Sequence, residues 1–220
     1  MTSPEIVDVY SALRLRMVES QLRARGIADE RVLVAMVRVP RHEFAPERYR
    51  DQAYEDHPLP IAEGQTISQP YIVASMLEAL QLSQNDKVLE VGTGSGYVTA
   101  LLAELAPEVV SIERHSSLAE RSRELLAGMG YTNVRIIVGD GSRGFAELAP
   151  YDAIIVSAAA PELPCALIEQ LAEGGRMIIP VGSDDAQQLQ LIRLVNGQHE
   201  IVSRELCRFV PLVSEKWSGG

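Results

Sequence analysis

Three glycines that follow a short apolar run form the clearest ligand-binding pattern in the chain. The run is Val88-Leu-Glu-Val91, and the glycines stand at positions 92, 94 and 96. The apolar positions suit a buried parallel strand, and glycine lets the backbone approach a ligand at the start of the next helix. The pattern predicts a strand, a tight turn and a helix start that bind a nucleotide-like ligand; a turn built only for packing is the alternative.

Two nearby residues narrow the choice of ligand. The dinucleotide fingerprint requires glycine or alanine three positions after the second glycine, where this chain has Tyr97. Glu90 lies inside the strand, and a pyrophosphate is disfavoured by a neighbouring carboxylate. Because a positively charged ligand without phosphate accepts a carboxylate, the pattern favours S-adenosylmethionine over a nicotinamide cofactor.

Acidic side chains and glycines recur where the next expected strands end. Glu113 ends the strand expected over 109–113, and it follows Gly92 by 21 positions (113 − 92). At that spacing a carboxylate can bind both hydroxyls of a ribose. Gly139-Asp140-Gly141 follows the strand expected over 134–138. Ligands of a doubly wound sheet bind beyond the carboxyl ends of its strands, so these residues are expected to converge there.

The irregular stretch over 54–71 is a second candidate for function. It contains three prolines and one glycine, so it cannot form a long helix or a central strand. Its polar end, Gln65-Thr-Ile-Ser-Gln69, is suited to display hydroxyl and amide groups over a cleft. The alternative is structural, because Ser68 is equally placed to N-cap the helix expected over 70–82.

Alternating strands and helices must position these residues. The expected strands cover 88–91, 109–113, 134–138, 153–156 and 176–181, and expected helices cover 115–129 and 164–172. This alternation predicts an α/β fold with a doubly wound, mostly parallel, Rossmann-like sheet. Asn196-Gly197 joins alternating stretches at 187–195 and 199–209, so an antiparallel C-terminal hairpin is expected to complete the sheet.

Two helices are expected ahead of the sheet. The first covers 4 to about 25, with Ser3 as a possible N-cap, Pro4 at its first position and Gly26 at its end; the second covers 29–39. One domain over 1–220 is therefore expected, in which 1–70 supply the N-terminal helices and the polar loop. Residues 71–195 form the cofactor-binding core, and 196–220 the C-terminal strands.

Composition limits the class of partner. The net charge is −10, from 30 acidic and 20 basic residues, which disfavours a nucleic acid partner because phosphates are bound through clustered Lys and Arg. Cys165 and Cys207 are far apart and lack neighbours at ligand spacing, so no disulfide and no metal site are predicted. No apolar run approaches the ~20 residues that cross a bilayer. We expect a soluble, cytoplasmic protein that binds no membrane and is a monomer.

The segment after the strand at 153–156 argues against one class of methyltransferase. Enzymes that methylate a base nitrogen carry Asn/Asp-Pro-Pro-Tyr/Phe there, whereas this chain has Ser157-Ala-Ala-Ala-Pro161. A base is therefore not the expected acceptor.

Four motifs in a fixed order carry a resemblance to a known family. They are Gly64-Gln-Thr-Ile-Ser-Gln-Pro70, Val88-Leu-Glu-Val-Gly-Thr-Gly-Ser-Gly-Tyr97, Gly139-Asp-Gly141 and Phe209-Val-Pro-Leu212. With them the chain resembles bacterial protein-L-isoaspartate O-methyltransferases from about Leu13 to Val213. The glycine turn matches many methyltransferases, whereas the Gln-Thr-Ile-Ser-Gln-Pro segment is far more specific.

The resemblance implies protein repair. These enzymes transfer a methyl group from S-adenosylmethionine to the α-carboxylate of an L-isoaspartyl residue, which forms when Asn or Asp in an aged protein rearranges. The ester then promotes return to the succinimide. The resemblance implies an active-site role for Ser68, and it implies that Thr66, Ile67, Ser68, Gln69, Val210 and Leu212 hold the isoaspartyl substrate.

Roles in cofactor binding follow for the glycine turn and the strand ends. Backbone amides around Gly92, Thr93 and Gly94 are expected to bind the methionine carboxylate, and Glu113 the ribose hydroxyls. Asp140 and Gly141 are expected at the adenine edge. Glu90 either senses the methionine ammonium or is a buried carboxylate that holds the turn through backbone amides.

The chemistry itself demands little acid–base catalysis. A carboxylate with a pKa near ~4 is ionised about a thousand to one at pH 7, so the nucleophile needs no general base. His42, His57, His115 and His199 are accordingly expected to be structural or exposed. Because the reaction neutralises a carboxylate and a sulfonium, a mostly apolar cleft is expected, with Val210, Leu212 and Ala158–Ala160 at its walls.

Two other functions remain open from the sequence. One keeps S-adenosylmethionine but methylates a small-molecule carboxylate or hydroxyl. The other is a non-catalytic protein that recognises damaged chains.

Overall fold

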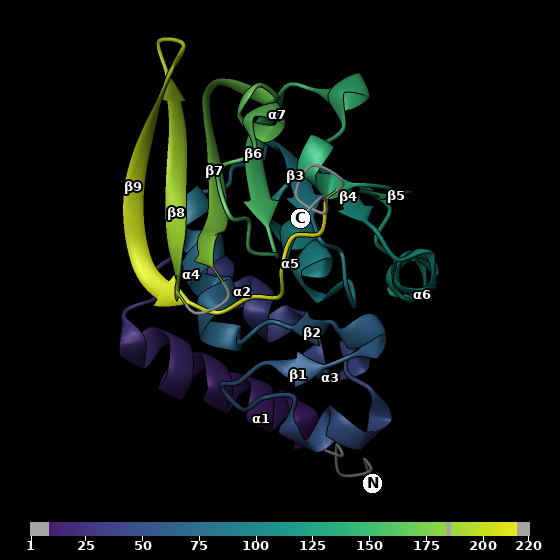
Figure 1. Ribbon diagram of the computed structural model, residues 1–220. Helices are drawn as coiled ribbons and strands as arrows, with labels where there is room; N and C mark the ends of the chain where they lie inside the picture. The colour runs from purple at the N-terminus through teal and green to yellow at the C-terminus, as the bar shows by residue number, and fades with distance from the viewer. Residues whose placement is uncertain (1–8, 184–185, 215–220) are drawn as a thin grey trace, which may run out of the picture.

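A seven-stranded sheet is formed by the apolar runs that the sequence marks as strands. The computed structural model describes residues 9–183 and 186–214, and its sheet has the strand order β5-β4-β3-β6-β7-β8-β9 (Figure 1). In this spatial order, the neighbours from β5 through β4, β3 and β6 to β7 pair in parallel. Strand β8 pairs antiparallel with β7 and with β9, and this arrangement confirms the predicted fold class. The strands are β3 Lys87–Val91, β4 Glu108–Glu113, β5 Val134–Val138, β6 Tyr151–Val156, β7 Leu171–Ser183, β8 Ala186–Val195 and β9 Gln198–Cys207.

The strand order reverses at β3. This strand pairs with β4 on one side and with β6 on the other, so that Val91 lies opposite both Ile112 and Val156. The carboxyl ends of the three strands therefore meet at one edge of the sheet. In an open α/β sheet, this reversal is the point at which ligands bind.

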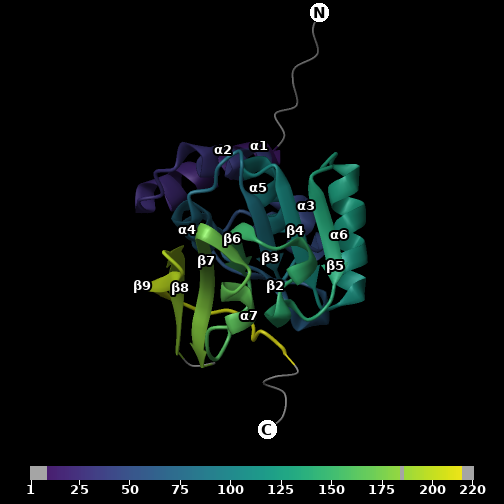
Figure 2. The same ribbon diagram turned by 90° about the horizontal axis from the view of Figure 1, so that it is seen from above.

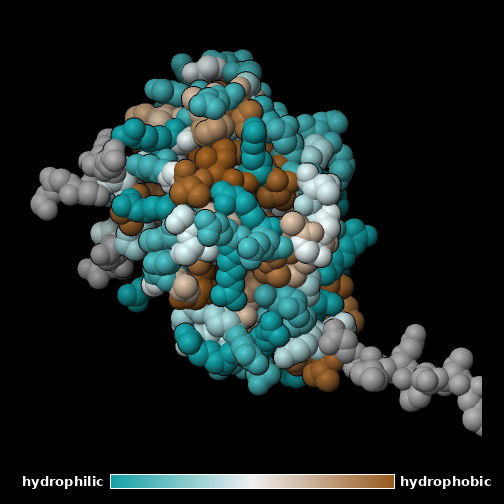
Figure 3. All heavy atoms as spheres, turned by 90° about the vertical axis from the view of Figure 1, so that its right-hand side faces the viewer, coloured by the Kyte–Doolittle hydropathy of each residue, from teal (hydrophilic) through white to brown (hydrophobic). Residues whose placement is uncertain are grey.

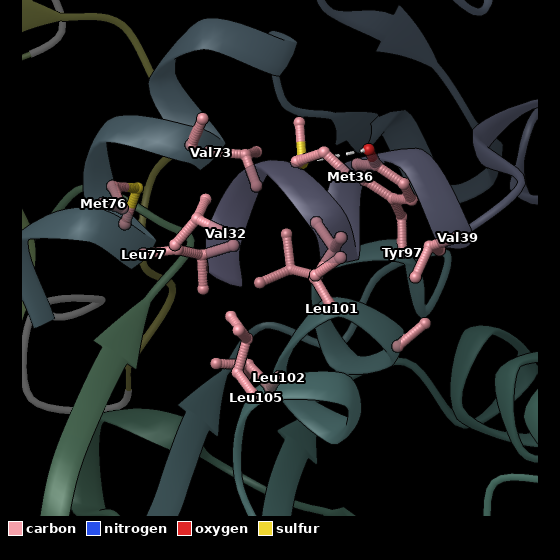
Figure 4. Packing of buried hydrophobic residues seen from close by; sticks show 14 of the residues in the cluster. Val32, Met36, Val39, Val73, Met76, Leu77, Tyr97, Leu101, Leu102 and Leu105 are labelled. Atoms are coloured by element: carbon pink, nitrogen blue, oxygen red, sulfur yellow. Dashed lines mark hydrogen bonds between the residues drawn. The ribbon is translucent and has the colours of Figure 1, made fainter. Parts of the chain in front are cut away.

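One face of the sheet is covered by helices α4 (Pro70–Leu80) and α5 (Tyr97–Leu105). Helix α2 (Glu30–Arg38) packs on both of them, as Figure 4 shows. The contacts are almost entirely aliphatic, apart from a weak hydrogen bond from the Tyr97 hydroxyl to the Met36 sulfur at 3.4 Å. The labelled core residues are Val32, Met36 and Val39 near α2, Val73, Met76 and Leu77 on α4, and Tyr97, Leu101, Leu102 and Leu105 on α5.

The opposite face is covered more thinly than the sequence suggests. The helix expected over 164–172 is wrong in extent, because α7 covers only Cys165–Ile168 and β7 begins at Leu171. The backbone of Gln170 accepts a hydrogen bond from Tyr151 N–H (2.8 Å), and Leu171 pairs with Tyr151. Pairing with the start of β6 therefore ends the helix after one turn.

The N-terminal helices lie on the outer side of α4 and α5, as Figure 2 shows. Helix α1 (Val9–Met17) continues through a π-helical turn, Val18–Leu22, and a 3-10 turn, Arg23–Arg25, to Gly26, whose φ of 97° ends it as predicted. The expected cap at Ser3 and start at Pro4 lie outside the described residues. Asp29 caps α2 by accepting from Arg31 N–H at 2.9 Å.

Aromatic side chains fix this helical layer to the core. The rings of Tyr10 and His42 stack with centroids 3.9 Å apart, and His42 Nδ1 lies 2.7 Å from the Tyr54 hydroxyl. Phe44, on the short helix α3 (Arg41–Phe44), meets Tyr97 edge-on at 5.6 Å. These contacts anchor the N-terminal helices to the core, and His42 is structural, as expected from the sequence.

The irregular stretch over 54–71 holds a small hairpin that the sequence does not reveal. Strand β1 (Leu59–Pro60) pairs antiparallel with β2 (Thr66–Ile67), and Leu59 lies opposite Ile67. Both of these side chains are buried, so the stretch is pinned to the core while the polar residues around Ser68 stay at its edge.

The C-terminal hairpin forms as predicted at Asn196-Gly197, which has φ values of 53° and 71°. The second strand ends at Cys207 rather than Phe209, because Phe209 N–H donates to the Gln187 side chain at 2.6 Å and leaves the ladder.

The far edge of the sheet is formed by β5, beside helix α6 (Ser116–Gly128). Figure 3 views this side and shows hydrophobic residues in its middle part among hydrophilic ones. Val138 at the end of β5 is 46% exposed. Within the described ranges, none of the helices has the length and apolar character needed to cross a membrane.

Candidate active site

A cleft of about 770 Å³, open to solvent, lies at the point where the strand order reverses. Ligands of an open α/β sheet bind at this point, beyond the carboxyl ends of the strands. The walls come from the end of the irregular stretch, the glycine turn after β3, the end of β4 and the segment 209–214. Of the thirteen residues predicted from the sequence, ten line this cleft: Thr66, Ile67, Ser68, Gly92, Thr93, Gly94, Glu113, Gly141, Val210 and Leu212.

Hydrogen bonds to β4 hold the glycine turn. Gly92 has a φ of 94°, and its N–H donates to Ile112 O at 2.8 Å. Thr93 N–H donates to the same oxygen at 3.3 Å, and Gly94 N–H donates to Glu113 Oε2 at 2.8 Å. The predicted contact of these three amides with a ligand carboxylate is therefore not supported, because all three donors are already engaged within the protein.

Glu113 ends β4 at the cleft, where the sequence placed it. The residue is only 5% exposed, and its second oxygen, Oε1, accepts from His115 N–H at 2.9 Å. Since each carboxylate oxygen has two lone pairs, the group can still accept hydrogen bonds from ligand hydroxyls. Both backbone contacts hold the carboxylate at the cleft wall.

Glu90 lies beneath the glycine turn and not in the cleft. The side chain is fully buried, and Oε2 accepts from the hydroxyls of Thr99 and Ser111, each at 2.6 Å. No described residue bonds to Oε1. Burial raises the pKa of Glu90 to about 8, although the two hydroxyls lower it. The carboxyl group is therefore largely protonated at neutral pH, and it is held by hydroxyls instead of the backbone amides considered from the sequence.

Asp140 is an anchor for the chain and is not part of the cleft wall. Its Oδ1 accepts from Ser142 N–H at 3.0 Å and from the Ser142 hydroxyl at 2.7 Å. Gly141 does line the cleft, and a Cβ at that position would lie 2.4 Å from Val91 Cγ1. The backbone of Gly141 can therefore sit flush against β3 only because it has no side chain.

The segment 209–214 contributes Val210 to Val213 to the wall of the cleft. It runs across the strand ends, where Ala159 N–H donates to Val210 O at 2.8 Å and Leu212 N–H donates to Ala159 O at 2.7 Å. The Ser142 hydroxyl meets the Ser214 hydroxyl at 2.7 Å. These bonds bring Val210 and Leu212 to the cleft as predicted.

Ser68 lies in the link between β2 and α4, half-buried at the cleft wall. It does not cap α4, because the helix N-cap is Gln69 and Tyr71 N–H donates to Asp56 Oδ1 at 3.0 Å. Asp56 also accepts from the Gln69 side chain at 2.7 Å. Within the described residues the Ser68 hydroxyl has no hydrogen-bond partner, so it is free to bind a ligand.

Several lining residues were not found from the sequence. His115 was expected to be structural or exposed, yet it lines the cleft, with Nδ1 3.7 Å from Glu63 Oε2. Its position just after β4 was the available signal, because loops that follow parallel strands face the ligand. Other lining residues that were missed are Ser95, Arg114, Ser157 and Val213, whereas Gln65 lies at the cleft as expected.

Comparison with known proteins gives a consistent picture. Residues 14–217 match the family described as Protein-L-isoaspartate(D-aspartate) O-methyltransferase (PCMT). A Koribacter versatilis protein described as Protein-L-isoaspartate O-methyltransferase is 55% identical over 214 residues, which are 97% of this chain and 96% of that protein.

Two solved structures extend the comparison to the fold. One, described as a protein-L-isoaspartate O-methyltransferase, is 29% identical with a TM-score of 0.83; the match covers 91% of this chain and 66% of that chain. The other is a putative protein-L-isoaspartate O-methyltransferase from Plasmodium falciparum in complex with S-adenosyl-L-homocysteine. It is 30% identical with a TM-score of 0.78, and the match covers 91% of this chain and 98% of that chain.

Proposed function

Because this chain belongs to the protein-L-isoaspartate O-methyltransferase family and is a protein repair methyltransferase, we propose that it methylates L-isoaspartyl α-carboxylates in the cleft described above. S-adenosylmethionine is the donor and supplies the methyl group from its sulfonium. The observation that carries the proposal is the meeting of Ser68, Gly92 and Glu113 in one cleft, although Ser68 lies 24 positions (92 − 68) before the glycine turn.

The residues around the cleft fit a nucleoside-type donor. Glu113 presents a fixed carboxylate suited to ribose hydroxyls, and Gly141, packed closely against Val91 of β3, contributes backbone to the cleft wall. Glu90, neutral at pH 7 and buried below, supports the turn without adding a second charge beside Glu113. We propose that Glu113 and Gly141 contact the donor directly, whereas Gly92, Thr93 and Gly94, whose amides are already engaged, shape the wall against which it lies.

The acceptor side needs orientation and little else. An isoaspartyl carboxylate is already ionised at neutral pH, so it needs no base. The unpartnered hydroxyl of Ser68 can donate one hydrogen bond that aims a carboxylate oxygen without neutralising it. Ile67, Val210 and Leu212 add apolar surface beside Ser68, where a bound carboxylate would be less hydrated than in free solution.

Methyl transfer to matched peptides tests this function. With radiolabelled S-adenosylmethionine, an isoaspartyl peptide should be methylated and its normal aspartyl twin should not. Equal labelling of the two peptides would favour the alternative function, a methyltransferase that acts on a small-molecule carboxylate or hydroxyl. Donor binding with no transfer to either peptide would indicate a non-catalytic protein that binds damaged chains.

Replacing Ser68 with alanine should separate its role from folding. One hydrogen bond to a charged group contributes about 1.5–3 kcal/mol, so kcat/KM for the isoaspartyl peptide should fall roughly 10- to 100-fold. The dissociation constant for S-adenosylhomocysteine, measured by calorimetry, should stay unchanged. Ser20→Ala on the N-terminal helix is the control, and a parallel loss of donor binding in Ser68→Ala would contradict the assignment.

We further propose that the acceptors are isoaspartyl-containing proteins and peptides and that the enzyme acts as a cytoplasmic monomer. One chain supplies every wall of the cleft, so a second subunit is not required. Both cysteines are unpaired, which fits a reducing compartment. Sedimentation at working concentration tests the monomer, and a concentration-dependent dimer would contradict it.

A further inference from the structure

A second groove, of about 940 Å³ and open to solvent, lies beside the cleft. One wall is the link between β2 and α4 with Ile72, and the other is the end of β9 with Arg208 and Phe209. Thr66 and Ser68 line both the cleft and this groove. The groove therefore begins at the residue assigned to orient the acceptor carboxylate.

An isoaspartyl residue lies within a polypeptide, and its α-carboxylate is a branch from the main chain. Once that branch reaches Ser68, the flanking residues must leave over the surface of the enzyme. The groove offers such a path because it shares Thr66 and Ser68 with the cleft. It also lies at the end of β9, the last strand of the sheet, whose outer edge pairs with no strand of residues 9–183 or 186–214.

The charge of the groove indicates which acceptor peptides it binds. Arg208 is exposed in the groove, and no carboxylate among the described residues pairs with it. Two acidic residues next to groove residues are already engaged: Asp56 bonds to the side chain of Gln69, and Glu205 directly precedes Leu206. Asp56 is bound by Arg25, the Gln69 side chain and Tyr71 N–H, whereas Glu205 is bound by the Ser75 hydroxyl and lies 3.7 Å from Arg204.

We propose that this groove holds the acceptor segment beside the isoaspartyl residue and that Arg208 favours segments with an acidic side chain there. An unneutralised cation stands out on a chain whose net charge is −10, and it attracts acidic peptides that the rest of the surface repels. Leu206, which is 78% exposed at the same groove, offers an apolar contact to the rest of the segment. The inference rests on the proposed acceptor site at Ser68.

Peptide kinetics test the role of Arg208. Isoaspartyl peptides carry Glu or Gln at each flanking position in turn. At one or more positions the Glu peptide should have a KM about fivefold lower than the Gln peptide, as expected for one partly exposed ion pair, with equal kcat. Arg208→Gln should abolish the difference, and high salt should shrink it in the unaltered enzyme.

Matched variants keep the result interpretable. Arg193→Gln makes the same chemical change on the neighbouring strand β8, outside the groove, and should preserve the preference. Arg208→Glu should reverse it, so that a Lys peptide at the same position becomes the better substrate. An Arg208→Gln enzyme whose KM rises equally for Glu and Gln peptides would overturn the inference.

Different results would contradict the role of Arg208 and the methyltransferase function at Ser68. Equal KM values for Glu and Gln peptides at every position, with normal methylation, would overturn the role of Arg208 and leave the proposed function intact. No methylation of any isoaspartyl peptide by the unaltered enzyme would overturn both.

Discussion

Replacing Glu113 with alanine is expected to weaken S-adenosylhomocysteine binding about 100-fold or more, since two hydrogen bonds to a charged group contribute roughly 3–6 kcal/mol. The carboxylate is placed to accept the ribose hydroxyls, and it also holds Gly94 N–H at the turn. Its loss therefore removes ligand contacts and loosens the turn that forms the adjacent wall.

Calorimetric titration measures this effect. Glu108→Ala removes the same charge from the exposed, opposite end of β4 and should bind the ligand normally. Unchanged affinity in Glu113→Ala would show that the carboxylate serves the turn alone. A cooperative thermal transition in both variants excludes unfolding as the cause.

Replacing Glu90 with glutamine is expected to flatten the dependence of stability on pH. The folded-state pKa is about 8, whereas the ordinary value is 4.5, so between these values the folded protein binds the proton and the unfolded chain does not. Stability is therefore intact below pH 4.5 and falls as pH rises toward 8, by roughly 5 kcal/mol at most.

Glutamine does not titrate, but its amide nitrogen would be unpaired where Oε1 lies now, at a pH-independent cost of about 1–3 kcal/mol. Glu90→Gln should thus be less stable than the unaltered protein at about pH 5 and more stable at about pH 9. Urea unfolding measures both. Glu120→Gln on the exposed surface of α6 is the control, and parallel pH profiles for Glu90→Gln and the unaltered protein would contradict the buried-acid account.

The sheet could be predicted because its signals are local. Apolar runs at β3, β4 and β5 are each followed by glycine or acidic residues, and Asn196-Gly197 marks its own hairpin. The extent of α7 could not be predicted in this way, because it is limited by pairing between Tyr151 and Leu171, which are 20 positions apart (171 − 151).

The sequence predicts most of the residues that line the cleft, but it predicts their hydrogen-bond partners less well. Ten predicted residues meet in the cleft, since residue type and spacing report which groups face a ligand. The hydrogen-bond partners of these residues differ from those expected. Asp56 replaces Ser68 as the support for α4, and Glu113 occupies the amide expected to bind the ligand. Such pairings depend on tertiary distances, which a single sequence does not encode by spacing.

The wall formed by residues 209–214 has a consequence for how the enzyme matures. The residues proposed to bind the donor lie between Gly92 and Gly141, so contacts among them close over short separations. The acceptor site requires Ser68 and Val210, 142 positions apart (210 − 68), to reach the same cleft. Contacts at such separation close slowly because the loop entropy is larger. We therefore expect the acceptor site to form later in folding than the turn and strand ends proposed to bind the donor.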